Sequence, residues 1–211
     1  MIIAVDGPAA AGKGTLSRLL AEHYALAWLE TGSLYRAVAL KMLRSGDDPQ
    51  DSVAAENAVK LLKPTELHDP ELRREDVGEA ASIVAAIPSV RAALVGFQRD
   101  FADDPPGDAQ GAVLDGRDIG AVVCPDADYK IYVTATPEAR AHRRFLELRE
   151  KGEAEDEQKV LAATRERDAR DTERATSPLK PAADAHLLDT TNLSIDAAFA
   201  ALKVYISGSS D

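Results

Sequence analysis

A glycine-rich loop between two apolar segments constrains the fold of this chain more than any other feature. Residues 2–5 form a short apolar run, and Leu16, Leu19 and Leu20 recur at helical spacing after the loop. The loop itself reads Gly7, Pro8, Ala9, Ala10, Ala11, Gly12, Lys13, Gly14 and Thr15. A strand, a loop of this kind and a helix predict a P-loop, in which backbone N–H groups at a helix N-terminus surround phosphate oxygens.

Lys13 and Thr15 have the most specific expected roles in this loop. Lys13 would contact the β- and γ-phosphates of a nucleotide, and the Thr15 hydroxyl would lie near Mg²⁺, directly or through water. Ser or Thr usually follows the lysine directly, but here Gly14 intervenes, and this order resembles nucleotide kinases more than GTPases. The alternative is an ordinary glycine-rich turn, which would need neither the lysine nor the hydroxyl.

Strand and helix patterns alternate along the chain, which predicts an α/β fold with a parallel sheet. We expect one domain, since 211 residues with 45% apolar content suffice for one core. Residues 47–107 contain several helical patterns and no convincing strand, so they are expected to form a helical insert. Pro137 and Ser194 mark the starts of two later helices. The candidate strands are residues 2–5, 27–29, 112–115, 129–134 and 186–188.

Charge and cysteine content narrow the classes of partner. The net charge of −11 argues against nucleic acid, whose backbone requires a basic face. A single cysteine, Cys124, excludes an internal disulfide framework and fits a small buried side chain. No apolar run approaches the roughly 20 residues that span a membrane, and no signal peptide precedes the first strand. We therefore expect a cytoplasmic protein without a membrane or nucleic-acid partner.

Two further loops should lie beside the P-loop. Residues 30–36 and 115–120 follow the second and third candidate strands, and ligands in parallel sheets bind outside the carboxyl ends of the strands. These loops supply Arg36 and Arg117, which suit a second phosphate group. A structural salt bridge is the alternative for Arg36 and is less natural for Arg117 in a glycine-flanked loop.

Arginine is concentrated near the C-terminal third: eight of the sixteen lie between residues 140 and 174. Arg167, Arg170, Asp171 and Arg174 share one helix face at positions i, i+3, i+4 and i+7. Like charges at this spacing repel one another unless an anion lies between them. On composition alone a solvated, salt-bridged helix pair is the better interpretation, but a P-loop creates a need for such cations. The preceding helix repeats the pattern with Arg140, Arg143 and Arg144.

These motifs together resemble the bacterial cytidylate kinases, in the same order and over nearly the whole chain. The resemblance rests on the P-loop, on Thr-Gly-x-x-Tyr-Arg at 31–36, on Asp-Gly-Arg-Asp-Ile-Gly at 115–120 with 122–127 after it, on 140–144, and on Glu-Arg-Asp-x-Arg-Asp at 166–171. Adenylate kinases carry a different loop after the third strand. A GTPase would need an Asn-Lys-x-Asp motif, which this sequence lacks.

The resemblance implies transfer of the γ-phosphate of ATP to CMP, and also to dCMP, by a monomer that uses Mg²⁺. It implies a five-stranded core (residues 1–46, 108–146 and 175–211), an acceptor-binding insert (47–107), and a lid with an arginine-rich helix (147–174). It assigns ATP binding to residues 7–15, and phosphoryl transfer to Lys13, Arg143 and Arg170. It assigns binding of the acceptor phosphate to Arg36, Arg117 and Arg174. It assigns recognition of cytosine to Ser82, Arg91 and Asp118. It assigns contacts with the sugar region to Thr31, Arg167 and Asp171.

One departure and three alternatives accompany this assignment. Many cytidylate kinases have a longer insert with a small β-sheet, whereas residues 62–77 here are short and contain Pro64 and Pro70. That departure affects the expected base and sugar contacts and leaves the phosphate site unaffected. The alternatives are a P-loop kinase for UMP or shikimate, and a nucleotide-binding module without transfer activity.

Overall fold

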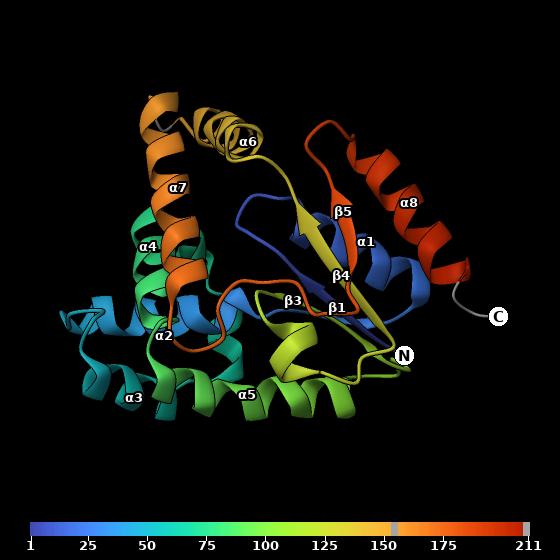
Figure 1. Ribbon diagram of the computed structural model, residues 1–211. Coiled ribbons are helices and arrows are strands. Elements are labelled where there is room, and N and C mark those ends of the chain that lie inside the picture. Colours follow the sequence, from blue (N-terminus) through green and yellow to red (C-terminus); the bar gives the residue numbers. More distant parts are fainter. Residues whose placement is uncertain (153–155, 209–211) are drawn as a thin grey trace.

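The computed structural model describes residues 1–152 and 156–208 and contains a parallel sheet of five strands (Figure 1). All five expected strands are confirmed, each to within two residues at its ends. The sheet order is β2-β3-β1-β4-β5, so the first strand is central. The strands are β1 (Ile2–Asp6), β2 (Ala27–Glu30), β3 (Ala112–Gly116), β4 (Tyr129–Thr134) and β5 (His186–Asp189).

The register of the sheet brings the ends of the neighbouring strands together. Asp6, at the end of β1, pairs with Gly116 of β3 and with Tyr132 of β4. The P-loop and the loop after β3 therefore leave the sheet side by side. This adjacency follows from parallel pairing, because the carboxyl ends of all strands lie at one edge.

Apolar side chains cover both faces of the sheet, as continuous apolar strands require. On one face, α1 (Lys13–Tyr24) and α8 (Ile195–Gly208) pack Leu16, Leu20 and Leu202 against β1, β3 and β4. Ser194 accepts a hydrogen bond from the Ala197 N–H and caps α8 as expected. On the other face, α5 (Pro88–Asp103) and the π-helical turn η3 (Ile119–Val123) complete the core, which includes the buried Cys124.

Residues 47–107 form helices joined by turns and contain no strand, as expected. After α2 (Gly32–Ser45), they form α3 (Ser52–Lys60), the 3₁₀ turns η1 (Pro64–His68) and η2 (Pro70–Arg73), α4 (Glu75–Val84) and α5. Leu34, Val38 and Met42 of α2 pack with Val84 and Leu94 in a second core. Asp51 caps α3 by accepting hydrogen bonds from two backbone N–H groups.

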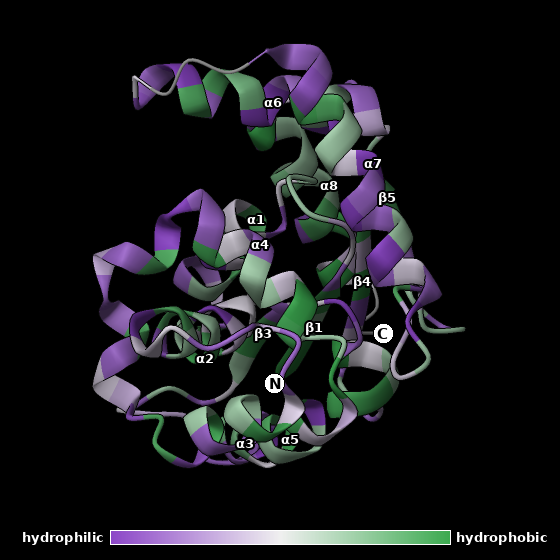
Figure 2. Cartoon of the chain, turned by 90° about the vertical axis from the view of Figure 1, so that its left-hand side faces the viewer, coloured by the Kyte–Doolittle hydropathy of each residue, from purple (hydrophilic) through white to green (hydrophobic). Residues whose placement is uncertain are grey.

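Two polar helices extend from the sheet over its carboxyl edge. They are α6 (Pro137–Glu150) and α7 (Glu157–Glu173), held together by a small cluster of Ala141, Leu148 and Val160. In Figure 2 the central strands are green, whereas α6 and α7 carry many purple, hydrophilic turns. Residues 153–155 of the expected lid lie outside the described residues.

None of the helices in the described part of the chain is long and apolar enough to cross a membrane on its own. α4 and α5 together reach the required length and composition, but they are bent by 100° relative to each other.

Candidate active site

A cavity of about 1080 Å³ lies at the carboxyl ends of the strands. The loops after β1, β2 and β3 form its floor, and α4, α6 and α7 supply further walls. Among the described residues, twelve Lys or Arg and nine Asp or Glu side chains line it. The lining is therefore net positive in a chain whose net charge is −11.

The P-loop owes its shape to two residues in the left-handed region and one close backbone contact. Ala10 has φ 57° and Gly12 has φ 90°, and α1 begins at the next residue. Gly7 has φ 143°, and a Cβ there would collide with the Val133 carbonyl oxygen. The sequence thus needs glycine at residue 7 so that the loop can lie against β4.

The residues assigned to ATP divide into two groups. Seven of them line the cavity: Ala9, Ala10, Ala11, Gly12, Lys13, Gly14 and Thr15. Gly7 and Pro8 are not among the lining residues. The Pro8 carbonyl accepts a hydrogen bond of 2.7 Å from Lys13 Nζ, which holds the lysine within the loop.

Lys13 is buried among charges of both signs. Burial and, second, the nearby charge of Arg117 lower the pKa of its ammonium from 10.5 to about 7, against the opposing charge of Asp115. An anionic ligand beside Lys13 would favour the charged form. In the ligand-free protein the charged ammonium of Lys13 is therefore disfavoured, and a bound phosphate would offset that cost.

Two buried carboxylates lie at the ends of β1 and β3. Asp6 accepts hydrogen bonds from the N–H groups of Ile119 (2.7 Å) and Gly120 (2.8 Å), and so fixes the loop after β3. Asp115 accepts a hydrogen bond of 2.9 Å from Trp28 Nε1 and lines the cavity. Burial raises the pKa of each carboxyl to about 6.

Asp115 and Thr15 both line the cavity and carry oxygen atoms of the kind that bind Mg²⁺. The described residues contain no cluster of three or more His, Cys, Asp and Glu side chains that would hold a metal alone. Mg²⁺ needs no such cluster, because it usually binds one or two protein oxygens together with water and substrate phosphates. The donor set therefore suits a magnesium ion that arrives with a nucleotide.

The residues assigned to transfer and to the acceptor all line this one cavity. They are Lys13, Thr31, Arg36, Ser82, Arg91, Arg117, Asp118, Arg143, Arg167, Arg170, Asp171 and Arg174. They come from the P-loop, α2 with the residue that precedes it, α4, α5, the loop after β3, and α6 and α7 with the residue that follows α7. The fold thus assembles side chains that are up to 161 residues apart in sequence.

Three of these cations are held close to one another. Arg117 donates from Nε to Asp171 (2.8 Å), Arg36 donates to the Leu72 carbonyl (2.7 Å), and Arg174 donates to the Ser177 carbonyl. Burial lowers the pKa of Arg36 and of Arg174. Burial also lowers the pKa of Arg167 to about 10, and for this residue the positive charge of Arg117 is the second cause. Such mutual repulsion is relieved by an anion placed between the groups.

A buried ion pair forms part of the cavity lining. The Arg91 guanidinium pairs with the Asp118 carboxylate, and both side chains are almost fully buried. Arg91 also lies over the Tyr35 ring, 5.6 Å from its centroid. Within the described part of the chain, Ser82 Oγ and Arg91 Nε have no hydrogen-bond partner. Buried polar atoms without partners are costly, so this part of the lining is suited to a polar ligand.

Arg140 differs from the expectation that it lines an anion site together with Arg143 and Arg144. Arg143 and Arg144 do line the cavity, and Arg143 bonds Thr190. Arg140 is not among the lining residues, and it pairs instead with Asp168 and with the backbone carbonyls of Ala135 and Ala9. The anion-site interpretation of Arg140 is wrong, because protein acceptors already occupy its guanidinium.

Sequence reasoning missed one wall of the cavity, the loop between β5 and α8. Thr190, Leu193, Ser194 and Ile195 line it, and Thr190 Oγ1 donates to the Ala11 carbonyl of the P-loop (3.0 Å). Polar residues directly after a parallel strand had identified the other loops, and residues 190–192 carry the same signal. Trp28, on β2, was missed because a tryptophan in a strand is usually a core residue.

Comparisons with known proteins agree with this arrangement. The family model for cytidylate kinase matches residues 3–207. A cytidylate kinase of Afipia carboxidovorans is 58% identical over 196 residues, covering 93% of this chain and 92% of that protein. One from Methylocella silvestris is 56% identical over 211 residues, covering 100% and 96%. A solved structure of an uncharacterized protein from Eubacterium ventriosum matches over 98% of both chains, with a TM-score of 0.57 and 15% identity, a likeness of fold alone.

Proposed function

This chain belongs to the cytidylate kinase family, and from that premise we propose that it transfers the γ-phosphate of ATP to CMP, and also to dCMP. The products are ADP and the corresponding cytidine diphosphate. The observation that carries the proposal is the layout of the cavity. One cavity is lined by the P-loop, by a group of arginines and by the buried Arg91–Asp118 pair.

On the donor side, the P-loop N–H groups and Lys13 hold the ATP phosphates. Thr15 and Asp115 would hold Mg²⁺, directly or through water, and the ion would supply neutralisation of the phosphate charge. Arg143 and Arg170 approach the transferring group and offset the negative charge on its oxygens in the transition state. Phosphoryl transfer asks mainly for such positioning and charge neutralisation.

On the acceptor side, Arg36, Arg117 and Arg174 bind the phosphate of CMP. Thr31, Arg167 and Asp171 contact the sugar region. Asp118 accepts a hydrogen bond from the cytosine amino group, while Arg91 Nε and Ser82 Oγ, which lack partners in the described part of the chain, meet the ring acceptors. The acceptor phosphate has a second pKa near ~6, so at neutral pH it attacks without a general base.

The domain division, location and assembly of the protein form part of the same proposal. Residues 47–107 carry the acceptor contacts, and residues 147–174 form the lid and its arginine-rich helix, which exclude water so that ATP is not hydrolysed. We place the protein in the cytoplasm, as its substrates and its single buried cysteine suggest. We propose that the protein acts as a monomer.

An acceptor panel tests the reaction. ADP release is measured with ATP and Mg²⁺ in the presence of CMP, dCMP, UMP, shikimate or no acceptor, and with EDTA in place of Mg²⁺. We expect turnover that requires Mg²⁺ and is fastest with CMP or dCMP. A higher kcat/KM for UMP or shikimate would identify a different kinase, and turnover that ignores the acceptor would indicate a nucleotide-binding module.

Asp118→Asn tests base recognition with little change in shape. The amide places a donor against the cytosine amino group, and one unmatched buried hydrogen bond costs about 1–3 kcal/mol, or roughly 5- to 150-fold in kcat/KM. The kcat/KM for CMP should fall by that factor while the preference over UMP narrows. Arg36→Met is the control, because losing a phosphate contact should weaken CMP and UMP equally. An unchanged CMP-to-UMP ratio in Asp118→Asn would leave Asp118 as a support for its neighbours.

A further inference from the structure

We propose that Arg140 and Asp168 form a clamp that fixes the P-loop relative to α7, so that Arg140 acts as a positioning residue for phosphoryl transfer. Arg140 is in the first turn of α6, and Asp168 is on α7 beside the arginines that line the cavity. The inference rests on the proposed transfer reaction and assigns a role to two residues that touch neither substrate.

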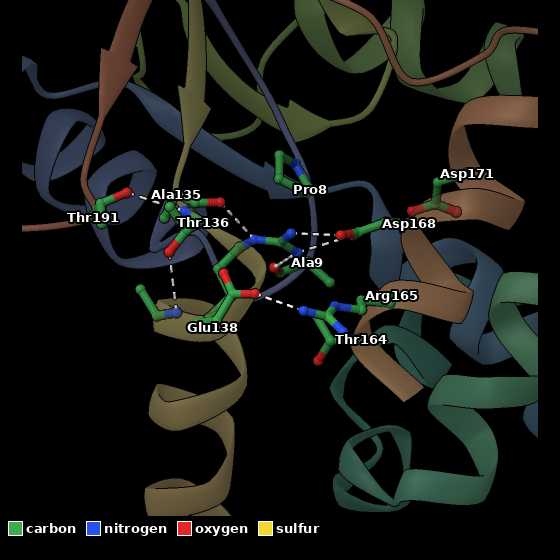
Figure 3. A network of polar contacts seen from close by, with 12 residues as sticks. Pro8, Ala9, Ala135, Thr136, Glu138, Thr164, Arg165, Asp168, Asp171 and Thr191 are labelled. Carbon is green, nitrogen blue, oxygen red and sulfur yellow. Dashed lines mark hydrogen bonds and ion pairs between the residues drawn. The ribbon is translucent and has the colours of Figure 1, made fainter. Parts of the chain in front are cut away.

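The donors of Arg140 are almost fully used by three separate segments. Nε donates to the carbonyl of Ala135 after β4 (2.9 Å), and Nη1 donates to the carbonyl of Ala9 in the P-loop (3.2 Å). Nη1 and Nη2 also donate to the two carboxylate oxygens of Asp168, at 2.9 and 2.5 Å. Figure 3 shows Ala9, Ala135 and Asp168 converging around this point. No edge of the guanidinium is left for a phosphate, so the role of Arg140 is indirect.

Two side chains hold the backbone carbonyls that directly precede Ala10, the non-glycine P-loop residue with a positive φ. Lys13 Nζ binds the Pro8 carbonyl, and Arg140 binds the next one, that of Ala9. Ala10 then adopts φ 57°, a conformation that a side chain disfavours and that persists only when its surroundings enforce it. Arg140, which is only 2% exposed, is part of those surroundings.

On the other side, the clamp sets the position of the catalytic face of α7. Asp168 lies directly after Arg167, two residues before Arg170 and three before Asp171. A bidentate arginine–carboxylate pair fixes direction as well as distance. The pair thereby holds the arginines of the acceptor side at a set distance from the P-loop of the donor side. A misplacement of about 1 Å between reacting groups can cost roughly 100-fold in rate.

The chain contains a matched control on the same two helices. Arg165 of α7 donates to Glu138 of α6 (2.7 Å), and Figure 3 shows this pair beside the clamp. Both side chains are about 60% exposed, and neither binds the P-loop in the described structure. Arg165→Gln removes an α6–α7 ion pair while it leaves the three-way contact of Arg140 intact.

The test compares Arg140→Lys, Asp168→Asn and Arg165→Gln with the wild type. Lysine keeps the charge but cannot reach three segments with a planar fork. Asp168 is partly exposed, so Asp168→Asn should fold even if Arg140→Lys does not. We expect kcat to fall about 10- to 100-fold in both clamp variants and to change less than about 2-fold in Arg165→Gln. Dissociation constants for each nucleotide alone should stay within about 3-fold.

A binding measurement distinguishes a positioning role of the clamp from an effect on folding, and it does not depend on turnover. Trp28 is the single tryptophan of the chain and lines the cavity, so its fluorescence reports nucleotide binding. A non-hydrolysable ATP analogue should tighten CMP binding in the wild type, and this coupling should shrink in the clamp variants. The proposal is overturned if Asp168→Asn leaves both kcat and the effect of the ATP analogue on CMP binding unchanged. It is also overturned if Arg165→Gln lowers kcat equally, or if the loss of kcat in the clamp variants matches a fall in their folded fraction. A wild type without turnover would refute the proposed reaction, while the coupling measurement would still test the clamp.

Discussion

Replacing Lys13 by Met should abolish phosphoryl transfer and at the same time stabilise the ligand-free protein. Methionine has a similar length and no charge, so the substitution removes the buried ammonium without leaving a large void. Transfer is lost because the contact of Lys13 with the phosphates strengthens as charge shifts in the transition state; we expect kcat to fall at least about 100-fold. Stability rises because the folded protein no longer has to bury a cation.

The size of the stabilisation follows from the pKa of Lys13, which burial lowers from 10.5 to about 7. Because the folded pKa is the lower one, the unfolded chain binds more protons between these values, and wild-type stability rises with pH across this window. At about 1.4 kcal/mol for each pKa unit, the buried cation costs on the order of 4 kcal/mol at pH 7 and about 2 kcal/mol at pH 9. The hydrogen bond to Pro8 that Met cannot make offsets about 1 kcal/mol of this.

Lys13→Met should therefore be more stable than the wild type by about 3 kcal/mol at pH 7 and by about 1 kcal/mol at pH 9. For a chain of this length that corresponds to a Tm about 6–12 °C higher at pH 7. Scanning calorimetry at both pH values, without nucleotide, measures the difference. Lys159→Met removes an exposed lysine of the same cavity and should shift stability by less than about 0.5 kcal/mol. A variant that is no more stable at pH 7, or whose advantage fails to narrow at pH 9, would refute the reasoning.

Three further predictions concern the insert, the lid and the core. Gly78→Ala would place a Cβ 3.0 Å from Arg36 Nη1, so the KM for CMP should rise several-fold while the KM for ATP stays unchanged. Gly96→Ala is the control, because a Cβ there has no neighbouring atom within 4 Å. Amide exchange in residues 147–150 should slow when both nucleotides are bound, and equal rates with and without them would argue for a rigid surface. Burial raises the pKa of the Cys124 thiol to about 11, so at pH 8 a thiol reagent should modify it on the order of 100-fold more slowly than in urea.

The sheet and the main walls of the cavity were predictable because their signals are local. An apolar run followed by Gly7–Thr15 predicts a strand, a loop and a helix independently of the rest of the sequence. Parallel pairing then places the loops after β1, β2 and β3 at one edge, so Lys13, Arg36 and Arg117 share a cavity as expected. The helical nature of residues 47–107 was predictable for the same reason, since helical periodicity is a local property.

Contacts between distant segments were not predictable from the sequence. The spacing of Arg140, Arg143 and Arg144 indicates which residues share a helix face but not what that face meets. Arg140 meets Asp168, 28 residues further on, and a P-loop carbonyl 131 residues earlier. Trp28 likewise reaches Asp115 across 87 residues. Nothing in the sequence around α6 or β2 encodes these partners, which depend on how whole elements pack.

The contrast between a net-positive cavity and a net charge of −11 has a consequence for how nucleotides arrive. Beyond about 8–10 Å, the Debye length at physiological salt, a nucleotide anion meets mainly the repulsion of the acidic exterior. Only inside that distance does the arginine-lined opening attract it. Added salt weakens the distant repulsion first, so the association rate of nucleotides should rise with salt at low ionic strength before it falls. Most enzymes that bind anions on a basic surface show only the fall.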